Sequence, residues 1–182
     1  GATLDGADYP AMLEKLTETS AYGELRHQQK TRRENGELVG IGLAIYVEPC
    51  GQGWESARVT RAGNGQVTAA VGTSAQGQGR ETACPQIVAD VLGMDPGDVQ
   101  VVHGDTDLTP KGIGALASRS TAIGGSALLQ AARQVKQQCE NAPHQKVFEA
   151  EVVYEPEAEA WSHGGSLCLL AIDPDTGVVE IE

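Results

Sequence analysis

Residues 76–82 combine the backbone and the side chains best suited to hold a polar ligand. The segment reads Gln-Gly-Gln-Gly-Arg-Glu-Thr, and apolar residues at helical spacing follow it directly. The first N–H groups of a helix lack intrahelical acceptors, and the helix dipole favours anions at that end. The glycines let the backbone approach a ligand closely, while Gln76, Gln78 and Arg80 add hydrogen-bond donors. This segment, named the glycine loop, therefore predicts an anion site at the start of a helix.

A second segment, residues 118–121, has a similar design and is named the serine loop. It reads Ser-Arg-Ser-Thr and precedes an alanine-rich stretch with helical spacing, so that Ser120 or Thr121 suits the N-cap position. A glycine-rich turn alone is more often only a turn, and Thr82 stands where the dinucleotide fingerprint G-x-G-x-x-G has its third glycine. Two such loops, each opening a helix, suit a ligand with a diphosphate and a polar heterocycle.

The patterns around these loops predict an α+β fold. The expected fold is a mixed sheet with two helices whose N-termini follow the polar loops, preceded by a helical hairpin. The hairpin occupies residues 1–36, with Asp8 as a cap and Asn35-Gly36 as a stop, and the α+β lobe occupies residues 37–182. The expected helices are 9–20, 22–34, 82–92 and 122–138, and the expected strands are 38–48, 56–60, 66–71, 98–103, 146–154, 166–172 and 178–181. One buried face is expected for the alternating residues of strand 38–48, namely Val39, Ile41, Leu43, Ile45 and Val47.

The composition excludes several classes of function. The net charge is −12 over 182 residues, which opposes nucleic-acid binding through a basic surface. No apolar run approaches the roughly 20 residues that a membrane span needs. The four cysteines are far apart and form no C-x-x-C pair, so neither a zinc site nor a disulfide framework is expected. These features favour a reducing, cytoplasmic compartment.

One further motif offers a different chemistry. Asp105 and Asp107 follow the expected strand 98–103 and could hold Mg²⁺ for phosphoryl transfer. Aspartates in this position more commonly form Asx-turns, so no protein metal ligand is predicted. A serine hydrolase is excluded because the sequence contains no G-x-S-x-G elbow.

The order of several motifs resembles one known family. The motifs are the glycine loop, Gln86-Ile87-Val88-Ala89, Leu92-Gly93, Gly104-Asp105-Thr106-Asp107, Pro110, Gly112, Gly114 and the serine loop. In this order they resemble the molybdopterin-binding large subunit of the molybdenum hydroxylases, which include xanthine dehydrogenase, aldehyde oxidase and aerobic carbon monoxide dehydrogenase. The similarity covers residues 8–136 and resumes over residues 154–181.

The resemblance implies an oxidoreductase that binds molybdopterin with molybdenum, in either the mononucleotide or the cytosine dinucleotide form. Such an enzyme oxidises an aldehyde, an N-heterocycle or a similar small molecule with water as the oxygen source. The pterin rather than a protein side chain holds the metal. The implied partners are other lobes or subunits of the same hydroxylase, among them iron–sulfur and flavin subunits. The implied cofactor-binding residues are Gln76, Gly77, Gln78, Gly79, Arg80, Glu81, Thr82, Ser118, Arg119, Ser120 and Thr121.

Departures from the family pattern limit what this chain is expected to do alone. Family large subunits are several times longer, and a connecting segment expected between residues 138 and 147 is absent. The G-x-G-E motif that carries the family's general-base glutamate is also absent. We therefore expect one lobe of a larger subunit, with no catalytic residue of its own and no turnover without partners. The alternative is a non-catalytic cofactor-binding or assembly module.

Overall fold

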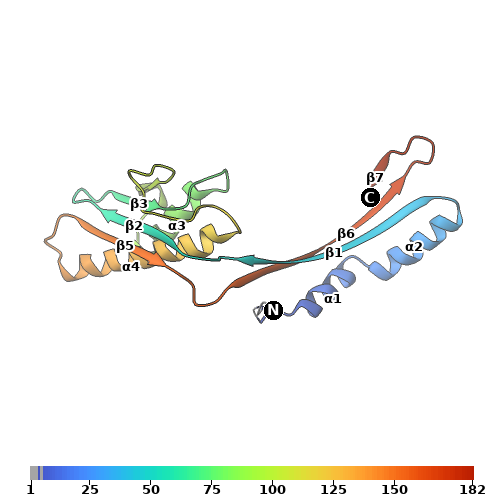
Figure 1. Cartoon of the computed structure of the whole chain (residues 1–182), viewed down its shortest axis with the longest axis horizontal. Coiled ribbons are helices and arrows are strands. Elements are labelled where there is room, and N and C mark those ends of the chain that lie inside the picture. The colour runs from blue at the N-terminus through green and yellow to red at the C-terminus, as the bar shows by residue number, and fades with distance from the viewer. Residues whose placement is uncertain (1–3, 5) are drawn as a thin grey trace. The chain divides into compact units, whose positions relative to one another are not determined.

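The computed structural model describes Leu4 and residues 6–182, which divide into two units (Figure 1). The terminal unit combines Gly1–Glu48 with Trp161–Glu182, and the central unit is Pro49–Ala160. The boundary between these units lies between Glu48 and Pro49, whereas the sequence predicts a domain boundary near residue 36. The reason is that strand β1 (Leu38–Cys50) is hydrogen-bonded to strand β6 (Ala160–Ile172), which joins the helical hairpin to the last strands of the chain.

The helical hairpin of the terminal unit forms where the capping residues predicted it. Helix α1 (Tyr9–Thr19) begins after Asp8, whose carboxylate accepts a hydrogen bond from the N–H of Ala11 at 2.9 Å. Helix α2 (Tyr22–Glu34) ends at Asn35, and the following glycine has a left-handed φ of +89°. In the part of the chain that the structure describes, no helix is both long and apolar enough to cross a bilayer.

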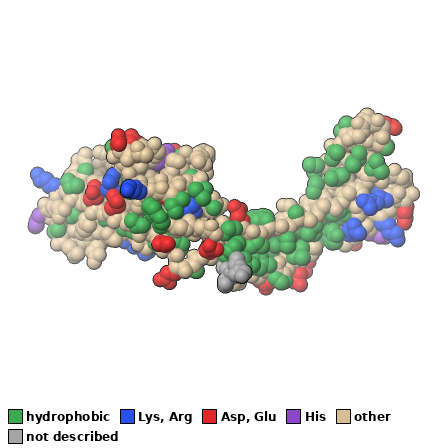
Figure 2. Space-filling view, viewed as in Figure 1, with side chains coloured by type: hydrophobic (Ala, Val, Ile, Leu, Met, Phe, Trp, Pro, Cys, Tyr) green, Lys and Arg blue, Asp and Glu red, His purple; other side chains and the backbone are tan. Residues whose placement is uncertain are grey.

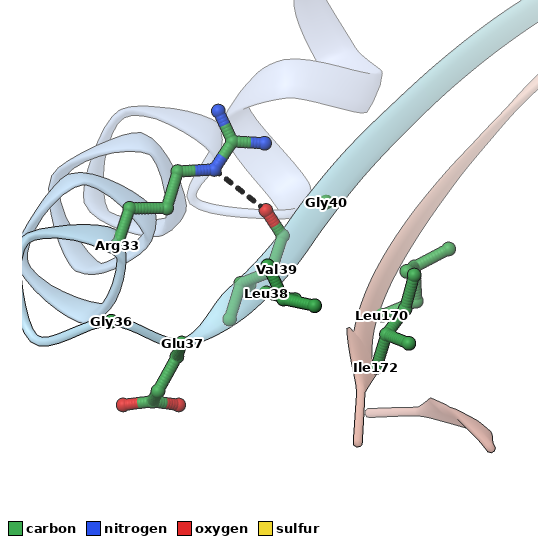
Figure 3. A pocket seen from close by; sticks show the side chains of 8 residues that line it. All are labelled: Arg33, Gly36, Glu37, Leu38, Val39, Gly40, Leu170 and Ile172. Carbon is green, nitrogen blue, oxygen red and sulfur yellow. Dashed lines mark hydrogen bonds between the residues drawn. The ribbon is translucent and has the colours of Figure 1, made fainter. Parts of the chain in front are cut away.

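The sheet of the terminal unit has the order β1-β6-β7, with β7 (Val179–Ile181) antiparallel to β6. The expected buried face of β1 is only partly present, because Val39 is 3% exposed whereas Leu43 and Ile45 are 40% and 54% exposed. Helix α2 covers the Val39 end: Nε of Arg33 donates to the Val39 carbonyl at 2.8 Å (Figure 3). Hydrophobic side chains therefore reach the surface of this unit (Figure 2).

The central unit has its own four-stranded sheet in the order β4-β3-β2-β5, so that the strands expected in one mixed sheet form two. Strands β2 (Glu55–Arg61) and β3 (Val67–Val71) form the expected hairpin, and β5 (Phe148–Tyr154) pairs with β2 in antiparallel fashion. Strand β4 (Val99–Val102) is parallel to β3, which requires a crossover connection. Helix α3 (Arg80–Leu92) provides it, and a short 3-10 turn (η1, Pro96–Asp98) leads into β4.

Helices α3 and α4 (Gly125–Asn141) complete the core of the central unit. Helix α4 contacts β2, β5 and α3, while α3 contacts β3 and β4. The predicted inward face of α4 is confirmed by Ala127, Leu128 and Val135, which are fully buried with the aliphatic side chains of the sheet. An aliphatic core of this kind holds the starts of both helices in fixed places.

Candidate functional site

The glycine loop follows β3 and leads directly into α3. Gly77 and Gly79 have φ values of +87° and +77°, a left-handed region that glycine enters without steric cost. Gly79 is the N-cap residue, so α3 begins at Arg80, two residues before the predicted start. The side chain of Gln78 closes the loop upon itself, because its Oε1 accepts from the N–H of Gln76 and its Nε2 donates to the Ser74 carbonyl. The loop is thus ordered by its own residues.

The serine loop opens α4 through a π-helical turn, η2 (Ser120–Gly124). Ala117 and Ser118 precede this turn with φ values of +44° and +50°. A non-glycine residue in this region costs about 1–3 kcal/mol and persists only where the surroundings enforce it. The prediction that a serine-loop side chain caps the helix is wrong, since no side-chain capping bond forms. The hydroxyl of Ser120 instead lies 2.9 Å from the hydroxyl of Thr73, in the interior.

The two loops line one cavity of about 360 Å³. Gln78 and Arg80 reach it from the glycine loop, and Ser118, Ser120 and Thr121 reach it from the serine loop. Both helix starts therefore face the same space, as expected for two loops that serve one ligand. A cavity of about 520 Å³ in the terminal unit (Figure 3) is larger. It offers no pair of helix starts, so we place the candidate site by chemistry and not by size.

Arg80 is a buried cation at this cavity. The residue is 4% exposed, and its Nε has no hydrogen-bond partner among residues 4 and 6–182. It also takes part in none of the ion pairs formed by the described residues. Burial raises the pKa of the neighbouring Cys84 thiol, and the charge of Arg80 opposes this shift. Arg80 hydrogen-bonds to Cys84 and attracts the Glu81 carboxylate without forming an ion pair with it, so an anionic group in the cavity fits this buried cation well.

Glu81 lies outside the cavity and is held by a residue that the sequence reasoning did not place in the site. Its carboxylate is 2.9 Å from Nε2 of His103, just beyond β4, and Nδ1 of the same ring accepts from the N–H of Ala75 at 3.4 Å. The glutamate's own backbone N–H and the His103 ring hold the pKa of Glu81 below its usual value. His103 therefore ties β4 to the glycine loop and to α3.

Arg119 was expected to contact the cofactor, but the structure places it in the interior. Its side chain has no exposed surface. Nη1 pairs with Oε2 of Glu55 at 2.5 Å, and Nε donates to the carbonyl of Gln52 at 3.0 Å. Further bonds from the guanidinium reach the carbonyls of Gly114 and Trp54. The guanidinium hydrogen-bonds to protein groups in the interior, so Arg119 supports the serine loop without lining the cavity.

Glu55 is the second residue that sequence reasoning missed. It begins β2 and is fully buried, and its Oε2 also receives the N–H of Gly114 at 3.3 Å. Its Oε1 has no hydrogen-bond partner within the described chain and lies against two glycines. A Cβ atom at Gly72 or Gly112 would be 2.6 Å or 1.8 Å from Oε1, so both positions require glycine. A charged residue at the head of a buried strand is the signal that could have drawn attention to it.

The remaining predicted residues have simpler places. Gln76 and the two glycines shape the glycine loop, and Thr82 is exposed on α3. Oδ1 of Asp105 accepts from the N–H of Asp107 at 2.9 Å, so this segment forms the Asx-turn that the sequence favoured.

Comparison with known proteins identifies the family. Residues 15–161 match the family model of the molybdopterin cofactor-binding domain. The carbon monoxide dehydrogenase large chain of Afipia carboxidovorans is 35% identical over 154 residues, which is 75% of this chain and 19% of the relative. The 6-hydroxypseudooxynicotine dehydrogenase complex subunit gamma of Paenarthrobacter nicotinovorans is 36% identical over 72% of this chain and 17% of the relative.

A solved structure agrees with these relatives. Reconstituted CO dehydrogenase from Oligotropha carboxidovorans matches with a TM-score of 0.90 at 28% identity, covering 100% of this chain and 30% of that chain. This chain thus spans about a fifth of the length of the curated relatives it matches. The motif order, the paired loops and the match over residues 15–161 agree, and the chain belongs to the molybdopterin cofactor-binding domain family of the molybdenum hydroxylases.

Proposed function

We propose that this chain is one lobe of the molybdenum-binding subunit of a hydroxylase or dehydrogenase, and that it holds molybdopterin between the glycine loop and the serine loop. The observation that carries the proposal is Arg80, a buried cation with an unpartnered Nε at the cavity where both helix starts meet. Helix starts and a buried guanidinium together suit a phosphate group.

Each side chain at the cavity has a role that its chemistry suggests. Arg80 neutralises the anionic part of the cofactor. The Gln78 amide, which uses one N–H and one lone pair within the loop, pairs with the edge of the pterin through its second N–H and second lone pair. Ser118 and Thr121 add hydroxyl groups from the opposite wall. When bound, the cofactor supplies the redox chemistry of molybdenum, and the protein supplies binding and orientation.

We further propose the cytosine dinucleotide form of the cofactor. Its diphosphate carries more negative charge than a single phosphate and would match a cavity with one buried cation and two helix starts. Similarity to carbon monoxide dehydrogenase large chains supports the same choice.

The whole enzyme is proposed to oxidise an aldehyde, an N-heterocycle or a similar small molecule, with water as the oxygen source. The relatives' names, a carbon monoxide dehydrogenase and a 6-hydroxypseudooxynicotine dehydrogenase, support a small substrate. Their designations as a large chain and a complex subunit support partner subunits, which we take to be iron–sulfur and flavin subunits in the cytoplasm. The printed sequence contains no G-x-G-E motif, so a positioned base must come from elsewhere in the enzyme.

The test is to purify the chain with its co-purifying polypeptides and to measure molybdenum by mass spectrometry and pterin fluorescence after denaturation. Near-stoichiometric molybdenum and pterin, with cytidine nucleotide released on hydrolysis, are the expected result. Absence of pterin from the purified complex would contradict the proposal. Pterin without the nucleotide would contradict only the dinucleotide form.

A further inference from the structure

The conformation of the serine loop depends on Glu55 and Arg119, which do not line the cavity. Ala117 and Ser118 both have left-handed φ angles, and they come immediately before Arg119 in the chain. Two successive strained residues need an external restraint, because an unrestrained chain would relax to a more favourable region. Two backbone hydrogen bonds contribute: the Arg119 N–H donates to the Leu116 carbonyl at 3.1 Å across the turn, and the Gly51 N–H donates to the Ala117 carbonyl at 3.4 Å, which is long for such a bond.

The stronger restraint is the side chain of Arg119. Its guanidinium binds Glu55 on β2 and the carbonyls of Gln52, Trp54 and Gly114. These partners come from two segments: residues 52–55, which lead into and begin β2, and the stretch that leads into the serine loop. Because the guanidinium is planar and forked, it holds all its partners in one fixed arrangement. The backbone of Arg119 is therefore immobilised directly after the strained pair.

Glu55 fixes the other side of this arrangement. Its Oε2 receives both the guanidinium and the Gly114 N–H, so it holds each end of the six-residue stretch from Gly114 to Arg119. Ala115, Leu116, Ala117 and Ser118, which lie between these ends, all line the cavity. One buried carboxylate thus anchors a whole wall of the site.

We propose that Glu55 and Arg119 are positioning residues: their buried ion pair sets the left-handed turn at Ala117 and Ser118, and thereby the cavity wall that holds the cofactor. This inference rests on the proposed function of the cavity. Neither residue touches the ligand, since neither lines the cavity. Replacing a buried ion pair with apolar residues is often neutral for stability, whereas such a pair can specify one conformation. The effect of the pair should therefore appear in the geometry of the loop and in cofactor retention.

The test uses Glu55→Gln and Arg119→Lys in the full hydroxylase complex. The glutamine removes the charge at nearly constant shape, and the lysine keeps the charge but lacks the fork. Arg58→Lys is the matched control, because Arg58 also lies on β2 and pairs with Glu151 at 3.3 Å, but both of these side chains are partly open to solvent. The readouts are the release rate of the pterin, followed by its fluorescence, and hydrogen exchange of residues 112–121 compared with residues 127–135.

The expected result for Glu55→Gln and Arg119→Lys is release about 10- to 100-fold faster, the size seen when a group that orients a ligating residue is removed. Exchange should rise in residues 112–121 and stay unchanged in residues 127–135, while Arg58→Lys matches the wild type in both readouts. Wild-type release and exchange in a loaded variant would overturn the positioning role alone. A uniform rise of exchange across both segments would also overturn it, because it would indicate general destabilisation.

Failure of the proposed function would look different. A wild-type complex that carries no pterin would overturn the cofactor site, and the positioning role would fall with it. If Glu55→Gln does not fold, Arg119→Lys alone decides between the two outcomes, since a charged side chain is retained at that position.

Discussion

The hydroxyl of Thr73 lies 2.9 Å from the hydroxyl of Ser120, and both side chains are buried. Thr73 follows β3 and leads toward the glycine loop, whereas Ser120 begins the π-helical turn of the serine loop. This contact is therefore a direct link between the two walls of the candidate site.

A first prediction concerns this link. Thr73→Val should destabilise the protein by about 1–3 kcal/mol, because it leaves the Ser120 hydroxyl buried without that partner. Thr73→Val combined with Ser120→Ala should cost less than the sum of the two single changes, since no polar group is then stranded. Chemical denaturation of the three variants measures the coupling. Thr60→Val, which removes an exposed contact to Glu149, is the control and should change the free energy of unfolding little. Additive costs at Thr73 and Ser120 would show that the two hydroxyls are not coupled.

A second prediction separates the two cavity side chains of the glycine loop. Arg80→Ala in the full complex should cost about 1.5–3 kcal/mol of cofactor binding, as for a charge-assisted contact, and Gln78→Ala about 0.5–1.5 kcal/mol. Molybdenum content per protein, measured after dilution, should therefore fall further for Arg80→Ala. Because Arg80 is buried, high salt should leave this difference intact. Equal and full molybdenum content in both variants would mean that the glycine loop is only a turn.

A third prediction follows from the lowered pKa of Glu81. A carboxylate with a depressed pKa in the folded state stabilises the protein above the unfolded pKa, near 4.5, and loses that contribution as the pH falls through the folded value. Glu81→Gln should therefore lower the melting temperature at pH 7, and the difference from wild type should shrink as the pH is lowered from about 5 to 3. Thermal melting across this range checks the prediction. A difference that grows on acidification would have the wrong sign.

A fourth prediction contrasts two glycines. Gly112→Ala places a methyl group 1.8 Å from Oε1 of Glu55, so it must displace a buried carboxylate and should cost at least about 3 kcal/mol. Gly104 has a left-handed φ of +74° but open space around its Cβ position, so Gly104→Ala should cost only about 1–2 kcal/mol. Comparing the free energies of unfolding distinguishes collision from backbone strain. A Cβ at Gly112 would also lie 2.6 Å from the Gly72 carbonyl oxygen, so similar costs at both positions would indicate that neither the Glu55 side chain nor the Gly72 backbone resists the methyl group.

Much of the fold and part of the site could be predicted because the signals are local. Asp8 caps α1, Asn35 ends α2, and Gly79 comes just before α3, each through a backbone group a few residues away. The glycine loop and the serine loop were found in the same way. Because two helix starts were expected to bind one ligand, both loops were also expected to line one cavity.

What could not be predicted depends on residues that are distant in the sequence. Arg119 reads as a donor for a ligand until its partner Glu55, 64 residues earlier, is known. Leu43 and Ile45 alternate as in a half-buried strand, yet periodicity does not say how much of that face a helix will cover. The hydroxyl of Ser120 suits an N-cap, but a buried partner 47 residues away accounts for it instead.

The long sequence separations between these contacting residues also affect the order in which parts of the protein fold. Contacts spanning 47 and 64 residues form only after the intervening chain has closed into loops, and such closure slows folding. Helix α3 and the hairpin of β2 and β3 are local and can form first. We therefore expect the cavity to be assembled late, so that a newly made chain captures its cofactor only near the end of folding. In a refolding experiment, protection of residues 112–121 should lag behind that of α3.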